Sequence, residues 1–226
     1  MRVIEPMRIG IITGVEQEAA AFLPDQPGTT EQRAGLSIRH LDHAVHSIAI
    51  TCSGVGKVNA THATTTLAAA GLDLIMIIGT AGSLGTIAGD CFILADAVQG
   101  DYGAARSEGF THYTAGTWPI GPAQVHPFKA CAIPDIGLPL ARIASSDCFL
   151  ECPSQAALLR NQLGADLVDM ETAALAQVAG KLGLPWAGIK ATTDDANHAS
   201  GGDFMDNLVQ AAKRAAQAAE QIIASI

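Results

Sequence analysis

Short apolar runs that alternate with helical patterns constrain the fold of this chain more than any other feature. The most apolar run covers residues 74–78 and leads into a glycine-rich stretch at 79–85. Strands of this kind, separated from one another by helices, are typical of a mainly parallel sheet that is buried on both faces. We therefore expect an α/β fold, a three-layer sandwich with a central, mainly parallel mixed sheet.

The same pattern divides the whole chain into strands and helices. The expected strands are 8–13, 36–41, 45–52, 74–78, 91–98, 142–146, 167–170 and 186–192. The expected helices are 16–23, 58–70, 154–163, 171–182 and 203–224. A polar stretch at 24–30 is expected to be a loop. With 226 residues and no internal repeat, the chain is expected to form a single domain, 1–226.

Charge and hydropathy exclude several classes of partner. The formal net charge of −9 argues against nucleic acid, because a phosphate backbone needs a basic surface. No apolar run approaches the roughly 20 residues that span a bilayer. The first six residues lack the apolar core of a signal peptide, so we expect a cytoplasmic protein. The strand pattern begins only at Met7, which leaves Met1 and Met7 both open as the natural start.

Neither the cysteines nor the histidines form a metal-binding pattern. The five cysteines are odd in number and include no Cys-x-x-Cys pair, so we expect reduced, mostly buried thiols. His40, His43 and His46 are spaced by three and do not all share one face of a hairpin, so we expect them to be solvated. We expect no metal ion and no cofactor.

Two glycine-containing turns invite a phosphate-binding interpretation. The segment 54–59 lacks the third glycine of a dinucleotide fingerprint and the Ser/Thr of a P-loop, so we interpret it as a tight turn. The segment 79–85 follows the most apolar strand. Its glycines would let backbone N–H groups approach an anion or a hydroxyl closely, although a plain turn explains the pattern equally well.

Acidic residues gather where the predicted strands end. They form three pairs, Glu16 with Glu18, Asp169 with Glu171, and Asp194 with Asp195. Taken singly, each fits a helix N-terminus or a solvated loop. Ligands of parallel α/β sheets lie at the carboxyl ends of the strands, however, and all three pairs lie there. Together they favour a shared pocket.

Six short segments, in order, carry a family resemblance. They are 15–18 (VEQE), 53–58 (SGVGKV), 79–82 (GTAG), 146–149 (SDCF), 168–171 (VDME) and 193–194 (TD). The chain resembles the nucleoside phosphorylase/nucleosidase superfamily, specifically its 5'-methylthioadenosine/S-adenosylhomocysteine nucleosidases. The resemblance runs from Met7 to the last helix, and the stretch 100–140 matches poorly.

The resemblance implies a role for each matching residue. Asp194 would protonate the leaving purine at N7, and Glu18 would orient the attacking water and act as its base. Glu171 would accept both ribose hydroxyls, Phe149 would stack on the base, and the backbone of Leu150 would contact the purine edge. The remaining implied substrate contacts are Thr80, Ala81, Gly82, Thr193 and Lys190, with Val15, Val55, Met170 and Phe204 around an apolar 5' group.

Three departures from the family pattern stand out. The family has arginine where Lys190 stands near the water, and lysine keeps the charge but loses the planar fork. Thr80 replaces a serine and keeps the hydroxyl. The segment 101–122 holds four of the ten aromatic residues, which fits a ligand lid, a subunit contact or a local mini-core.

The expected function is hydrolysis of the N-glycosidic bond of an adenine nucleoside such as 5'-methylthioadenosine or S-adenosylhomocysteine. The family completes its 5' pocket from a neighbouring subunit, which implies a homodimer. A purine nucleoside phosphorylase is one alternative, but the arginines that such enzymes use are absent from 13–18 and 75–80. A nucleosidase for another purine nucleoside and a non-catalytic nucleoside-binding or storage protein are the other two.

Overall fold

The structure is a computed structural model that describes residues 5–226. The choice between Met1 and Met7 as the natural start therefore falls partly outside the described residues. The strands are β1 (Arg8–Thr13), β2 (Thr29–Arg33), β3 (Leu36–His43), β4 (His46–Cys52), β5 (Leu74–Ser83), β6 (Cys91–Gln99), β7 (Gly103–Arg106), β8 (Gly109–His112), β9 (Phe128–Lys129), β10 (Leu140–Ser145), β11 (Leu167–Asp169) and β12 (Trp186–Asp194). The helices are α1 (Glu16–Ala21), α2 (Lys57–Ala68), α3 (Pro153–Leu163), α4 (Thr172–Leu182) and α5 (Ser200–Ile223).

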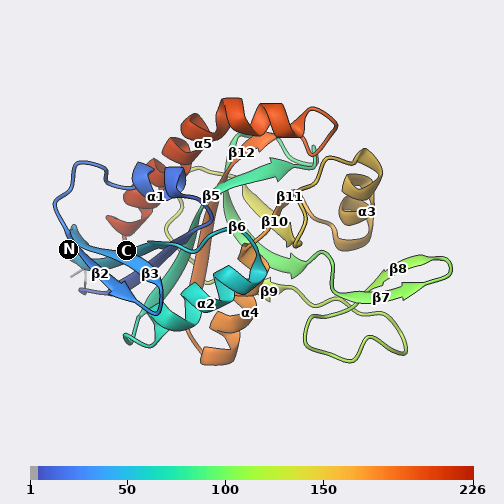
Figure 1. The fold of residues 1–226 in the computed structure, drawn as a ribbon, viewed down its shortest axis with the longest axis horizontal. Helices are drawn as coiled ribbons and strands as arrows, with labels where there is room; N and C mark the ends of the chain where they lie inside the picture. Colours follow the sequence, from blue (N-terminus) through green and yellow to red (C-terminus); the bar gives the residue numbers. More distant parts are fainter. Residues whose placement is uncertain (1–4) are drawn as a thin grey trace.

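A mixed central sheet organises the fold, as expected. Its strand order is β11-β10-β6-β12-β5-β1-β4-β3-β2, with β9 added beside β6 (Figure 1). Five of its ten pairings are parallel and five are antiparallel, so parallel pairings do not outnumber antiparallel ones. Three of the parallel pairings join β4, β1, β5 and β12 in the middle of the sheet, so the carboxyl ends of these strands meet at one edge.

Helices pack on both faces of this sheet. Figure 1 shows α1 and α5 on one side, with α2 and α4 on the other. Along β1, Ile9 and Ile11 belong to the core that includes the alanines of α5, whereas Ile12 belongs to the core that includes Leu67 of α2. This division follows from the alternation of side chains along a strand. The helices α3 and α4 each end at a left-handed glycine, Gly164 and Gly183.

All eight predicted strands and five predicted helices are present, with ends shifted by a few residues. The predicted loop 24–30 is partly wrong, because Thr29 and Thr30 begin β2. This strand lies at the sheet edge and is mostly exposed, so its polar sequence carries no apolar alternation. The predicted glycine turn 79–85 is also wrong at its start, since β5 continues to Ser83.

The poorly matching segment forms an arm that projects from the body of the molecule. It contains the two-stranded sheet of β7 and β8, followed by a long loop (Figure 1). The Tyr102 hydroxyl donates to the Thr117 carbonyl at 2.6 Å, and the Tyr113 hydroxyl to the Gly121 carbonyl at 2.7 Å. Two of its aromatic residues therefore stabilise the arm itself, while Trp118 remains 83% exposed.

Two expectations about polar side chains are wrong. His46 is buried, because it lies between Ile223 of α5 and Met7, whose N–H donates to its Nδ1 at 3.1 Å. The cysteines are free, but only Cys91 is buried and Cys148 is exposed. No helix within residues 5–226 is long and apolar enough to cross a membrane.

Candidate active site

A cavity of about 430 Å³ lies where β1, β5, β11 and β12 end. Thirteen of the fourteen residues singled out from the sequence line it. They are Val15, Glu18, Val55, Thr80, Ala81, Gly82, Phe149, Leu150, Met170, Glu171, Thr193, Asp194 and Phe204. The fourteenth, Lys190, does not line the cavity. One predicted site therefore collects residues from nearly the full length of the chain.

The Glu18 carboxylate lines the cavity and accepts four hydrogen bonds. The Thr80 N–H and hydroxyl donate to its Oε1 at 2.7 and 2.8 Å. The N–H groups of Gly14 and Val15 donate to its Oε2 at 2.9 and 3.1 Å. Gly79 makes this approach possible, since a Cβ there would lie 2.5 Å from Oε1. Four donors fill the acceptor capacity of a carboxylate and fix its orientation.

Glu171 lies at the N-terminus of α4, beside Gly14, whose N–H donates to Glu18. Its Oε1 accepts the Gly56 N–H at 2.8 Å, and its Oε2 accepts the Met170 N–H at 3.3 Å. Burial and the nearby Asp169 carboxylate raise the pKa of Glu171 to about 7, against the opposing charge of Lys190. Its charge is therefore sensitive to pH near neutrality, unlike that of an exposed glutamate.

Lys190 forms a buried ion pair instead of contacting the cavity. Its Nζ lies 2.9 Å from Asp169 Oδ2, and the two side chains are only 1% and 3% exposed. Burial opposes the charge on Lys190, but nearby carboxylates outweigh it and raise the pKa of the ammonium. Lys190 is thus the one predicted substrate contact that does not line the cavity, and its ammonium is paired with Asp169, which does.

Asp194 ends β12 with both of its oxygens in hydrogen bonds. The Ala196 N–H donates to Oδ1 at 3.0 Å, and the Thr193 hydroxyl lies 2.8 Å from Oδ2. The Thr193 hydroxyl also lies 3.4 Å from the Ala81 carbonyl, so it can turn from one acceptor to the other. The adjacent Asp195 is exposed and does not line the cavity.

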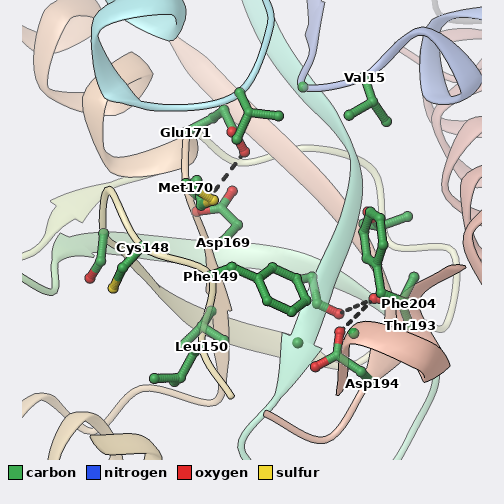
Figure 2. Close-up of a pocket in the computed structure, with 18 of the residues that line it drawn as sticks. Val15, Cys148, Phe149, Leu150, Asp169, Met170, Glu171, Thr193, Asp194 and Phe204 are labelled. Atoms are coloured by element: carbon green, nitrogen blue, oxygen red, sulfur yellow. Dashed lines mark hydrogen bonds between the residues drawn. The ribbon is translucent and has the colours of Figure 1, made fainter. Parts of the chain in front are cut away.

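Aromatic and aliphatic side chains cover the space between these carboxylates. Figure 2 shows Glu171 and Asp194 at opposite ends of the cavity, with the Phe149 ring projecting between them toward Phe204. The rings of Phe149 and Phe204 pack edge to face with centroids 5.7 Å apart. The site thus combines polar ends with an apolar wall, as small-molecule sites do.

Eight further residues line the cavity. Asp169 was expected there only as a member of a strand-end acidic pair, without a role of its own. The other seven were not predicted, and they are Gly14, Ser146, Cys148, Leu159, Val168, Gly201 and Met205. These seven are small or apolar, and such residues look the same in a pocket as in a core. The described cavity-lining residues include none from the arm, so Arg106, which donates to the Tyr113 hydroxyl at 2.8 Å, does not reach the site.

Metal binding finds no support in the donor set. Across residues 5–226, no group of three or more His, Cys, Asp and Glu side chains is arranged to hold an ion. The buried carboxylates of the site instead accept backbone N–H groups, hydroxyls or the Lys190 ammonium. The chemistry available is that of hydrogen bonding and proton transfer between carboxyl groups and a polar ligand.

Comparison with known proteins agrees with this geometry. A family model described as the phosphorylase superfamily matches residues 8–224. The 5'-methylthioadenosine/S-adenosylhomocysteine nucleosidase of Shewanella putrefaciens is 32% identical over 219 residues, which cover 91% of this chain and 93% of that protein.

Solved structures share the fold at lower identity. The 5'-methylthioadenosine/S-adenosylhomocysteine nucleosidase of Helicobacter pylori, with butyl-thio-DADMe-Immucillin-A, has a TM-score of 0.83 and 22% identity, covering 97% of this chain and 99% of its own. The futalosine hydrolase of Helicobacter pylori strain 26695 also has a TM-score of 0.83, with 21% identity and coverage of 97% and 98%. Because the family model spans nearly the whole chain and the sequence relative does too, this protein belongs to the phosphorylase superfamily, on the branch that contains the 5'-methylthioadenosine/S-adenosylhomocysteine nucleosidases.

Proposed function

We propose that this protein hydrolyses the N-glycosidic bond of an adenine nucleoside with an apolar 5' substituent, such as 5'-methylthioadenosine or S-adenosylhomocysteine. One observation carries the proposal: Glu18, Glu171 and Asp194 line the same cavity, whose remaining wall is largely apolar. The names of the sequence relatives support it. The fold alone does not select the substrate, since a futalosine hydrolase shares it to the same degree.

Asp194 is the proposed general acid. Cleavage of the bond to ribose leaves an oxocarbenium-like sugar and a purine anion, and proton transfer to N7 neutralises the anion. The two hydrogen bonds to Asp194 orient the carboxyl group. When Asp194 carries a proton on Oδ2, this O–H can donate a hydrogen bond to the Thr193 hydroxyl oxygen. The Thr193 hydroxyl then turns and donates its own hydrogen bond to the Ala81 carbonyl. Transfer to the purine then returns the carboxylate to its hydrogen-bonded, charged form.

Glu18 is the proposed base for water. The Thr80 hydroxyl donates to its Oε1, and this hydroxyl can rotate. When that hydroxyl turns away, Oε1 gains a free acceptor position for the water that attacks the anomeric carbon. A proton of the water passes to Glu18, and the oxygen of the water forms the new bond to the anomeric carbon. The products are the free base and the free sugar.

Glu171 is the proposed ribose-binding residue. A carboxylate has two acceptor oxygens and suits a pair of vicinal hydroxyls. One of its oxygens accepts the Gly56 N–H, which fixes the carboxylate plane at the end of the cavity opposite Asp194. The spacing leaves room for a nucleoside whose base lies near Phe149, with the Leu150 backbone at the purine edge. Ala81 and Gly82 also line the cavity.

The 5' substituent is proposed to lie among Val15, Val55, Met170 and Phe204. These side chains carry no charge, so a 5'-phosphate would lose its water without gaining a cation. A thioether there gains roughly 0.8 kcal/mol for each buried methylene. The apolar character of this part of the cavity favours thioether nucleosides over nucleotides.

Water is favoured over phosphate as the nucleophile. The described residues that line the cavity include neither arginine nor lysine. Lys190, the nearest candidate, is already paired with Asp169. A phosphate in this cavity would therefore meet four carboxylates, of which only Asp169 is paired with a cation. This electrostatic argument separates the hydrolase from the phosphorylase, and the retained carboxylates argue against a purely binding or storage role.

We also propose that the chain forms a single three-layer domain, acts in the cytoplasm and pairs as a homodimer. Helices on both sheet faces support the layers. Exposed apolar residues that line the cavity support a subunit contact, and they are Val55, Phe149 and Met205. Sedimentation velocity of the purified protein tests the dimer.

A panel of nucleosides tests the proposed activity. Purified protein is incubated with 5'-methylthioadenosine, S-adenosylhomocysteine, adenosine, inosine and futalosine, with and without phosphate, and the products are separated by chromatography. We expect adenine and free sugar from the two thioether nucleosides in both buffers. Sugar 1-phosphate would identify a phosphorylase. Nucleoside binding without any product would identify a binding protein.

A further inference from the structure

One charged residue near the cavity has no part in the mechanism above. Lys57 is the first residue of α2, and its ammonium donates to Asp101 Oδ1 at 2.5 Å. Its backbone N–H donates to Asp147 Oδ1 at 2.7 Å, and the Asp147 N–H donates to Asp101 Oδ2 at 2.9 Å. Asp147 Oδ2 lies 3.8 Å from the ammonium. We call this closed set of three residues the Lys57 clamp.

The clamp joins three segments that are far apart in the sequence. Lys57 follows the turn after β4, Asp101 follows β6 and begins the arm, and Asp147 follows β10. The turn itself is tightly constrained. Gly54 and Gly56 have φ angles of 82° and 101°, and a Cβ on Gly56 would lie 3.2 Å from Asp147 Oδ1. The turn and the clamp are therefore built around the same carboxylate.

Two of these segments lead directly into the cavity. Asp147 is followed by Cys148, Phe149 and Leu150, which all line it. Gly56, next to Lys57, donates its N–H to the ribose-binding candidate Glu171. The Phe149 side chain is 46% exposed, so much of its position depends on the backbone that carries it. The clamp acts on that backbone within two residues of the ring.

We propose that Lys57 is a positioning residue for the substrate base. Through Asp101 and Asp147, its ammonium holds the loop 147–150 so that the Phe149 ring covers the base. The inference rests on the proposed function. Lys57, Asp101 and Asp147 are 22%, 35% and 48% exposed. Solvent therefore weakens the ion pairs, and the effect of the clamp comes from the network that also holds two backbone N–H groups.

Loss of this positioning has a specific kinetic signature. Phe149 contacts the base equally before and during bond cleavage, so a displaced ring weakens ground-state and transition-state binding alike. Such uniform binding appears in KM rather than in kcat. For Lys57→Gln we expect KM for 5'-methylthioadenosine to rise roughly 5- to 20-fold, with kcat within about twofold of wild type.

The experiment compares three variants. Lys57→Gln removes the ammonium, Lys57→Arg keeps a cation, and Lys129→Gln is the matched control. Lys129 pairs with Asp96 at 2.6 Å and does not line the cavity. Steady-state kinetics with 5'-methylthioadenosine is measured for each. Hydrogen exchange of peptides that cover 146–152 is measured without ligand, which gives a readout independent of catalysis.

The expected result is a raised KM and faster exchange of 146–152 in Lys57→Gln. Lys57→Arg should recover KM to within about threefold, and Lys129→Gln should match wild type. An unchanged KM, or a loss confined to kcat, would overturn the positioning role. If wild type cleaves no adenine nucleoside, the proposed function fails instead. The exchange experiment then still tests the clamp, and unaltered exchange in Lys57→Gln would reject it.

Discussion

Lys190 and Asp169 form a 2.9 Å ion pair that is almost completely buried, and its Asp169 side lines the cavity. Asp169 also accepts hydrogen bonds from the hydroxyls of Ser145 and Thr172, and the Ser145 hydroxyl accepts the Ala173 N–H. The pair therefore links β12 to β10, β11 and the start of α4. The segment that it supports includes Met170 and Glu171, so its integrity bears on the ribose-binding end of the site.

Removal of the Lys190 ammonium is expected to destabilise the folded protein. Lys190→Met leaves a buried, uncompensated carboxylate and should lower the free energy of unfolding by about 3–5 kcal/mol. The matched control is Arg8→Met, because Arg8 forms a 3.6 Å pair with Asp73 in which both side chains are exposed. Such a pair contributes about 0–1 kcal/mol. Urea denaturation measures the free energy of unfolding of both variants. A Lys190 variant no less stable than the Arg8 variant would contradict this prediction.

Asp194 is expected to be essential for cleavage. Asp194→Asn preserves the size of the side chain but cannot deliver a proton, so kcat should fall by about 10²–10⁴. Asp195→Asn is the control, since its side chain is exposed and next to the site in sequence only. Release of adenine from 5'-methylthioadenosine is the measurement. Activity of the Asp194 variant within a few-fold of wild type would remove it as the acid.

Glu171 is expected to give the enzyme an acidic limb in its pH profile. With the pKa of Glu171 at about 7, the free enzyme gains its charged, hydroxyl-accepting form only as the pH rises through neutrality. Below that pKa, kcat/KM should fall roughly tenfold per pH unit. In Glu171→Gln this limb should disappear and kcat/KM should be low at every pH. Retention of the limb in the variant would assign it to another group.

The same carboxyl group should affect stability in the opposite direction. Its pKa in the folded protein is raised above the ordinary 4.5. Its contribution to stability is therefore complete below pH 4.5 and is lost as the pH rises through about 7. Relative to Glu171→Gln, wild-type protein should lose melting temperature over that window. If the difference in melting temperature between the two proteins stays the same at every pH, the raised pKa is contradicted.

The apolar end of the cavity is expected to select the 5' group. The kcat/KM for 5'-methylthioadenosine should exceed that for adenosine by roughly tenfold or more, since a methylthio group gains apolar contact. AMP should not be cleaved. Phe204→Ala should reduce the preference for the thioether while leaving adenosine cleavage within about threefold. If AMP proves to be the best substrate, the assignment of Val15, Val55, Met170 and Phe204 is wrong.

Much of the fold could be predicted because burial leaves a periodic pattern in the sequence. The apolar run of β5 and the amphipathic α5 are examples, and both were located within a few residues. The strand β2 was missed because it lacks this burial. It lies at an edge with most of its side chains in water, so its sequence does not need to alternate.

The sequence by itself indicated that acidic residues at strand ends share one pocket, and the family resemblance selected Glu18, Glu171 and Asp194 among them. Only the tertiary structure decided what each group contacts there. Lys190 pairs with Asp169 and does not line the cavity, and burial raises the pKa of Glu171. Hydrogen bonding and desolvation depend on distances between segments far apart in the chain. Those distances exist only once the sheet has brought the ends of its strands together.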